Sequence, residues 1–277
     1  MNWIQSAMMG LLSGLSEPMP MSAEAHRGLL SRMMGIGTVP PLFLLACHLA
    51  VLIVMLTWGG LDIQRLRKTA KLLKTPARRR PAHPDLNNAG TLRLLRTAAI
   101  LALAGRLLSC YLADTAYRLW LVAIPLILSG FLIWAPTQMR TANKDGRHLS
   151  AADGTLMGLG ALAAAVPGVS LTGGVTAIGS MLGVQRRYAI RFAWLLLCVN
   201  LAAAVVLDGL AVIAGGFTFE LQELLSALIG AISAGLGARI GIQLILSRIR
   251  SNAGDLTGFC YYNWGLALLC MALFLLV

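Results

Sequence analysis

The chain has 277 residues, of which 57% are apolar and only 12% are charged, and its mean hydropathy is +0.75. Soluble domains carry about 25% charged residues, so this composition excludes a cytosolic enzyme, a disordered chain and a secreted disulfide scaffold. Lys and Arg outnumber Asp and Glu by 23 to 11. Such an excess can indicate nucleic-acid binding, but membrane proteins concentrate the same residues in their cytoplasmic loops. We therefore predict an all-α polytopic membrane protein without a nucleic-acid partner.

Six apolar runs are long enough to form transmembrane helices. In chain order they cover residues 40–58, 93–110, 119–136, 188–207, 224–247 and 257–277. Two further apolar stretches, 8–35 and 155–183, are rich in Gly, Ser, Thr and Pro, and the first contains Glu17, Glu24 and His26. Such groups favour broken, re-entrant helices that line a polar cavity over plain spanning helices.

Basic residues collect in segments between the predicted spans. Eighteen of the 23 Lys and Arg residues lie in four segments: 59–92 with the start of the next span, 137–152, 183–191 and 248–256. The segment 208–223 has acidic residues but no basic residue. If the basic segments are cytoplasmic, the six helices alternate correctly only when the two re-entrant stretches do not cross. The sequence thus predicts that both termini lie outside. The basic loop 59–92 is predicted to be solvated, with contact to anionic headgroups as the alternative.

The two re-entrant stretches align without a gap when the chain is shifted by 148 residues. Residues 9–11 and 157–159 are both Met-Gly-Leu, and Ser22 falls on Ser170. We predict one membrane domain, 1–277, built from an inverted repeat. Its first half is 1–136, with the re-entrant stretch 8–35 and the basic cytoplasmic loop 59–92, and its second half is 148–277, with the re-entrant stretch 155–183. Such repeats place a polar site near the middle of the membrane.

The first re-entrant stretch carries the residues best suited to phosphate chemistry. The carboxylates of Glu17 and Glu24 could hold a divalent cation, Mg²⁺ or Ca²⁺, that bridges phosphate oxygens. His26 could transfer a proton or attack phosphorus, and Arg27 could neutralise charge. One such group alone could be structural, but three ionisable groups within an apolar stretch favour a functional cavity.

The second re-entrant stretch is rich in small and hydroxyl residues, including Ser170, Thr172, Gly173 and Thr176. Glycine lets backbone N–H groups approach an anion, and hydroxyls add donors. Small residues equally favour close helix packing, so the pattern alone leaves both interpretations open.

The two stretches resemble the motifs of the undecaprenyl-diphosphate phosphatases, the bacitracin-resistance type of membrane phosphatase. The first family motif is E-G-L-T-E-F-L-P-V-S-S-T-G-H, and residues 13–26 read S-G-L-S-E-P-M-P-M-S-A-E-A-H. The second is P-G-x-S-R-S-G-x-T, and residues 167–176 read P-G-V-S-L-T-G-G-V-T. Length, motif positions and hydropathy are similar over the whole chain.

The resemblance implies an enzyme of the bacterial cytoplasmic membrane that removes one phosphate from undecaprenyl diphosphate and so recycles the lipid carrier for cell-wall synthesis. It implies catalytic roles for Glu17, Ser22 and His26, and phosphate binding by Ser170 and Thr176. A homodimer is an oligomeric state that the sequence leaves open.

Several family residues are replaced in this chain. The first glutamate is Ser13, the second serine is Ala23 and the motif arginine is Leu171. Leucine cannot replace a bidentate phosphate ligand, although Glu24 and Arg27 are candidates to supply a carboxylate and a cation from other positions. We therefore expect weak, metal-dependent hydrolysis. A non-catalytic protein that binds or transports polyprenyl phosphate is the alternative, and a general small-anion transporter is a third.

Overall fold

The computed structural model describes residues 1–60, 63–76, 85–139, 143–216, 220–251 and 255–276. In this part of the chain, six helices are long and apolar enough to cross a membrane, as the hydropathy predicts. They are α3 (Pro41–Trp58), α5 (Leu86–Leu112), α6 (Leu119–Trp134), α9 (Arg186–Ala214), α10 (Leu221–Ser251) and α11 (Thr257–Leu276). Short 3₁₀ turns extend α5 through η2 (Ala113–Tyr117) and α6 through η3 (Ala135–Gln138).

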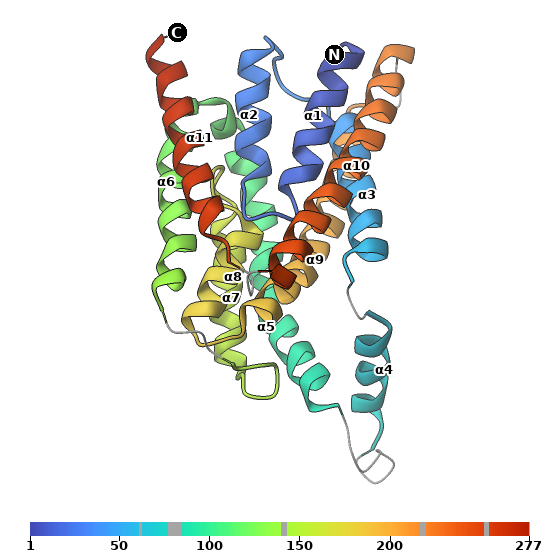
Figure 1. Cartoon of the computed structure of the whole chain (residues 1–277). Helices are drawn as coiled ribbons and strands as arrows, with labels where there is room; N and C mark the ends of the chain where they lie inside the picture. Colours follow the sequence, from blue (N-terminus) through green and yellow to red (C-terminus); the bar gives the residue numbers. More distant parts are fainter. Residues whose placement is uncertain (61–62, 77–84, 140–142, 217–219, 252–254, 277) are drawn as a thin grey trace.

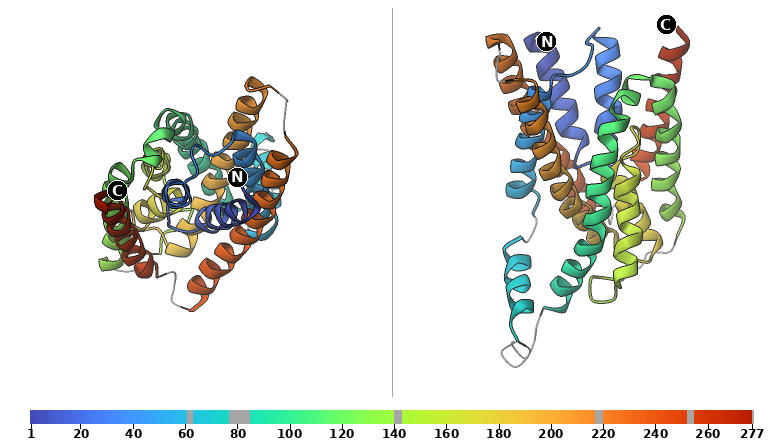
Figure 2. Two further views of the ribbon diagram at one scale, coloured as in Figure 1. Left: turned by 90° about the horizontal axis from the view of Figure 1, so that it is seen from above. Right: turned by 180° about the vertical axis from the view of Figure 1, so that it is seen from behind.

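The two predicted re-entrant stretches are helical hairpins that enter the bundle from opposite ends. One consists of α1 (Trp3–Ser16) and α2 (Ala23–Met33), and the other of α7 (Ala151–Ala163) and α8 (Leu171–Met181). Figures 1 and 2 show α1 and α2 descending from the end that carries both termini, whereas α7 and α8 rise from the other end. Among the described residues, the fold therefore has six helices suited to span a membrane and two hairpins that end inside the bundle.

The hairpins have equivalent helix limits. The first residues of α1 and α7, the first residues of α2 and α8, and the last residues of α2 and α8 are each 148 positions apart. The reason for the common start is capping, because Asn2 and Ser150 each form a capping box with the residue three positions later. These caps begin the hairpins a few residues earlier than the apolar pattern suggested.

The two ends of the molecule differ in the way that the charge distribution predicts. Both termini and the start of α10 lie at one end, and the segments between α3 and α5 and between α6 and α7 lie at the other (Figure 1). The segment 59–92 is not wholly a loop, because Ile63–Lys74 forms α4. Leu66 and Thr69 of α4 are buried, whereas all five of its basic residues are exposed. The predicted loop residues 61–62 and 77–84 lie outside the described residues.

The turn between α1 and α2 is bonded to three other helices. Pro18 and Pro20 have no N–H group and prevent α1 from continuing. The carbonyl oxygens of residues 17 to 20 each accept a hydrogen bond from a distant side chain: Thr172 Oγ1 to Glu17 O (3.2 Å), Trp194 Nε1 to Pro18 O (2.8 Å), Ser170 Oγ to Met19 O (3.2 Å) and Asn263 Nδ2 to Pro20 O (3.2 Å). Non-helical backbone at membrane depth requires such partners.

Small residues bring the hairpins close to the spanning helices. Gly10 and Gly14 of α1 face Gly230 and Ala234 of α10, and a Cβ atom added at either α1 glycine would overlap the backbone of α10. Helices in lipid associate largely through such close packing. The glycines therefore fix the position of α1, and with it the turn that follows.

We expect Gly14→Ala to reduce the free energy of unfolding by about 1–3 kcal/mol, because the new methyl group would push α1 away from α10. Thermal or SDS unfolding of the purified protein measures this. Gly265→Ala in α11 is the control, since nothing lies within 4 Å of the added methyl group. Equal stability of the two variants would contradict the packing described.

We expect Trp194→Phe to cost about 1–3 kcal/mol of unfolding free energy, because the Pro18 carbonyl would lose its indole donor while staying buried. Trp3→Phe is a matched control, since Trp3 is exposed. The same unfolding assay applies. A Trp194→Phe protein as stable as Trp3→Phe would mean that the turn does not need this bond.

Candidate functional site

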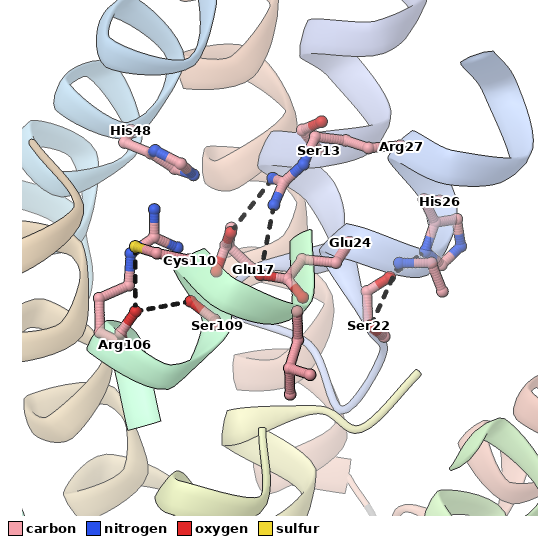
Figure 3. A network of polar contacts seen from close by, with 12 residues as sticks. Ser13, Glu17, Ser22, Glu24, His26, Arg27, His48, Arg106, Ser109 and Cys110 are labelled. Atoms are coloured by element: carbon pink, nitrogen blue, oxygen red, sulfur yellow. Dashed lines mark hydrogen bonds and ion pairs between the residues drawn. The ribbon is translucent and has the colours of Figure 1, made fainter. Parts of the chain in front are cut away.

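A polar cavity of about 50 Å³ lies between the tips of the two hairpins. Figure 3 shows several of the side chains around it. The first hairpin contributes Glu17, Ser22, Glu24 and Arg27, and the second contributes the turn that leads to Ser170. Residues of α5 and α9 complete the wall: Gly105, Arg106, Ser109, Leu197 and Asn200. The two sequence motifs, about 150 positions apart, therefore meet at one site.

Two serines at equivalent positions connect the hairpin tips. Ser22 caps α2 and Ser170 caps α8. Ser22 Oγ accepts bonds from Ala25 N (3.3 Å) and, across the interface, from Gly168 N (3.0 Å). Gly168 has φ +107°, and a Cβ atom there would lie 2.8 Å from Pro125 Cβ and from Val122 O, so only glycine fits this turn. Both helix N-termini border the cavity, an arrangement that favours an anionic ligand.

Arg27 lies between two carboxylates. Its Nη1 atom is 3.8 Å from Glu17 Oε1 and its Nη2 atom is 3.9 Å from Glu24 Oε1. Both separations exceed hydrogen-bond length, although only 12% of the Arg27 side chain is exposed. The guanidinium thus lies beside two carboxylates without a short bond to either, an arrangement that would let it donate to an incoming phosphate.

A second cavity, of about 150 Å³, adjoins the first and shares Glu24, Arg27, Arg106 and Ser109 with it. It contains a group of ionisable residues that the motifs did not indicate. His48 Nδ1 lies 2.6 Å from Asp208 Oδ2, and Arg106 Nη2 lies 3.6 Å from Asp208 Oδ1. The signal in the sequence was a histidine and an arginine inside two predicted spans, since such groups rarely face lipid.

The structure places His26 on the other side of α2 from Glu24 and Arg27 (Figure 3). Its Nδ1 atom is 2.6 Å from the carbonyl oxygen of Ser22, and its Nε2 atom is 2.6 Å from the hydroxyl of Tyr262, whose ring stacks on the imidazole. Helix geometry explains the separation, because each residue turns by about 100° around the axis. His26 does not line either cavity described above.

Three predicted phosphate ligands of α8 also point elsewhere. The hydroxyl of Thr172 donates to the carbonyl of Glu17, and Gly173 N–H donates to Ser170 Oγ. Gly173 and Thr176 line a separate cavity of about 10 Å³ with Arg186. Of the residues predicted for phosphate binding, the first cavity therefore gathers Arg27 and Ser170, and their phosphate role stays a prediction.

The carboxylates provide a limited set of metal ligands. Within the residues that the structure describes, no group of three or more His, Cys, Asp or Glu side chains is placed to hold a metal ion. Glu17 and Glu24 nevertheless line the same cavity. A hard cation such as Mg²⁺ commonly takes one or two carboxylates and completes its shell with water and phosphate oxygens. Glu17 and Glu24 could supply the protein ligands of such a cation, and the cation itself stays a prediction.

Comparison with known proteins identifies the family of the chain. Residues 6–269 match the family model of the bacitracin resistance protein BacA. An undecaprenyl-diphosphatase of Renibacterium salmoninarum is 27% identical over 99% of this chain and 96% of its own length. That of Micrococcus luteus is 32% identical over 71% of this chain and 70% of its own, and that of Carboxydothermus hydrogenoformans is 26% identical over 99% and 98%. The chain is a multi-pass membrane protein of the BacA bacitracin-resistance family.

Proposed function

We propose that this protein hydrolyses undecaprenyl diphosphate to the monophosphate and inorganic phosphate, and so recycles the lipid carrier of cell-wall synthesis. The observation that carries the proposal is the meeting of Glu17, Ser22, Arg27 and Ser170 at one cavity inside the helical bundle. The named relatives are undecaprenyl-diphosphatases, and two of them match 99% of this chain.

The chemistry assigned to these residues is attack of water on the terminal phosphorus. A carboxylate, Glu17 or Glu24, takes the proton of the water as the new P–O bond forms. The bond to the bridging oxygen breaks, and its electron pair leaves with the polyprenyl monophosphate. Arg27 and the N-termini of α2 and α8 stabilise the charge on the phosphoryl oxygens. His26 is bonded to the Ser22 carbonyl and so positions Ser22, the residue that caps the N-terminus of α2.

Charge balance supports the participation of a divalent cation, Mg²⁺ or Ca²⁺. The two adjoining cavities hold three carboxylates, Glu17, Glu24 and Asp208, and two guanidinium groups. A bound diphosphate would add further negative charge in a poorly solvated interior, where unbalanced charge is costly. A cation held by Glu17 and Glu24 would offset this charge and polarise the phosphate.

Binding without hydrolysis is the second candidate function, and two observations favour it. Leu171 lines the cavity at the position of the family's motif arginine, and His26 faces Tyr262. A site of this kind could hold or move a polyprenyl phosphate without cleaving it. The same purified protein separates the two functions, because only one of them releases phosphate.

We also propose the placement in the membrane. The protein lies in the bacterial cytoplasmic membrane with both termini outside, and residues 1–136 and 148–277 form the two inverted repeats. The clustering of basic residues at the end opposite the termini supports this orientation. A homodimer is compatible with this arrangement.

The activity prediction concerns purified protein supplied with undecaprenyl diphosphate. We expect slow phosphate release that requires Mg²⁺ or Ca²⁺, and a loss of about 10²–10³-fold in Glu17→Gln and in Arg27→Met, since each change removes a group that acts on the transition state. The controls are Glu220→Gln and Arg32→Met, two exposed positions outside the cavities. Unchanged activity in the Glu17 and Arg27 variants would refute the assigned site. Lipid binding without phosphate release by the unmodified chain would select the second function.

The topology prediction uses single cysteines in a cysteine-free background. Lys74→Cys and Lys144→Cys should react with membrane-impermeant reagents only from the cytoplasmic side, and Glu220→Cys only from outside. The reason is that Lys74 ends α4 and Lys144 lies between α6 and α7, both at the basic end of the molecule. Glu220 instead precedes α10, at the end that carries the termini. Labelling of all three positions from one side would rule out the proposed orientation.

A further inference from the structure

We propose that the second cavity is the subsite for the phosphate that stays attached to the lipid, and that Arg106 is its phosphate-binding residue. This inference rests on the proposed function, because it assigns the two phosphates of one diphosphate to the two adjoining cavities. The terminal phosphate then lies at the hairpin tips and the lipid-linked phosphate lies beside Arg106.

The lining of the second cavity fits a phosphate with an apolar tail. One part of the wall is polar or charged, with Glu24, Arg27, Arg106, His48 and Asp208. The other part is apolar, and its residues are Val39, Leu44, Ala113 and Ala116. A free inorganic anion would gain nothing from that apolar wall, whereas the first isoprene units of a lipid phosphate would bury their surface against it.

Arg106 has unused hydrogen-bonding capacity. Its side chain is 13% exposed, and its Nε atom is buried without a hydrogen-bond partner among the described residues. Its ion pair with Asp208 measures 3.6 Å, longer than a hydrogen bond. A buried guanidinium is normally paired through short bonds. Phosphate oxygens would supply the missing acceptors in the planar geometry that arginine prefers.

Asp208 and His48 position Arg106. The short contact from His48 Nδ1 fixes Asp208 Oδ2 and leaves Oδ1 toward the guanidinium. In Figure 3, His48 and Arg106 lie on the opposite side of Glu17 and Arg27 from Ser22. The two arginines therefore approach a bound diphosphate from different helices, Arg27 from α2 and Arg106 from α5.

Arg106 also explains how the site can lack arginine at position 171. Leu171 and Arg106 line the same cavity, from α8 and α5. A guanidinium on α5 can thus act on the cavity that the family's motif arginine would enter from α8. The positive charge of a guanidinium is thus retained at the cavity, although α5 supplies it in place of α8.

The test is binding of undecaprenyl monophosphate to the full-length protein in lipid nanodiscs. This lipid is the product of the proposed reaction, so it is not consumed during the measurement. We expect Arg106→Met to raise the Kd by about 10–100-fold, the effect of losing a charge-assisted hydrogen bond. Arg96→Met is the control on the same helix, because Arg96 is exposed, and its Kd should stay within about twofold of the unmodified protein.

Thermal unfolding checks that each variant is folded. If Arg106→Met does not fold because Asp208 is left unpaired, the double variant Arg106→Met with Asp208→Asn is used in its place. Arg106-dependent binding without phosphate release would support the subsite and refute the proposed hydrolysis. Normal hydrolysis with an unchanged Kd in the Arg106→Met protein would overturn the subsite and leave the hydrolysis standing.

Discussion

The hydrogen bonds on the turn between α1 and α2 are the constraint on which the site depends. Four successive carbonyl groups lie in the interior of a membrane protein without helical partners, and α8, α9 and α11 supply a donor to each. Exposed to lipid, these groups would cost several kcal/mol each. Bonding therefore holds the first hairpin tip against the second, and the glycines of α1 and α10 permit the close approach.

This arrangement also sets the electrostatics of the cavity. Because both hairpins turn inside the bundle, the N-termini of α2 and α8 border the same cavity. Charged side chains of α2, α5 and α9 line this cavity and the one beside it. The resulting arginine–carboxylate pairs are 3.6 to 3.9 Å long. Loosely paired buried charge is poor for stability. It suits the proposed site, in which these groups would exchange their internal partners for a phosphate.

The replaced motif residues are best understood in the same three-dimensional terms. Leu171 removes a cation from α8, and Arg106 places one at the same cavity from α5. A linear motif records the helix that carries a group, whereas an anion in the cavity would respond only to where the charge lies. Comparing motifs position by position therefore overstates the loss at this site, and it overlooks His48 and Asp208 completely.

The sequence alone indicated the six spans, the two re-entrant stretches and the equivalence of Ser22 and Ser170, because hydropathy and an internal repeat can be read directly from the chain. It also indicated that Glu17 and Arg27 belong to a polar cavity, since charges in apolar segments need one. The tertiary structure decided that His26 faces Tyr262, that Thr176 lies in another cavity, and that Arg106 meets Asp208. Those facts depend on which face of each helix meets helices distant in the sequence, and no local pattern contains that information.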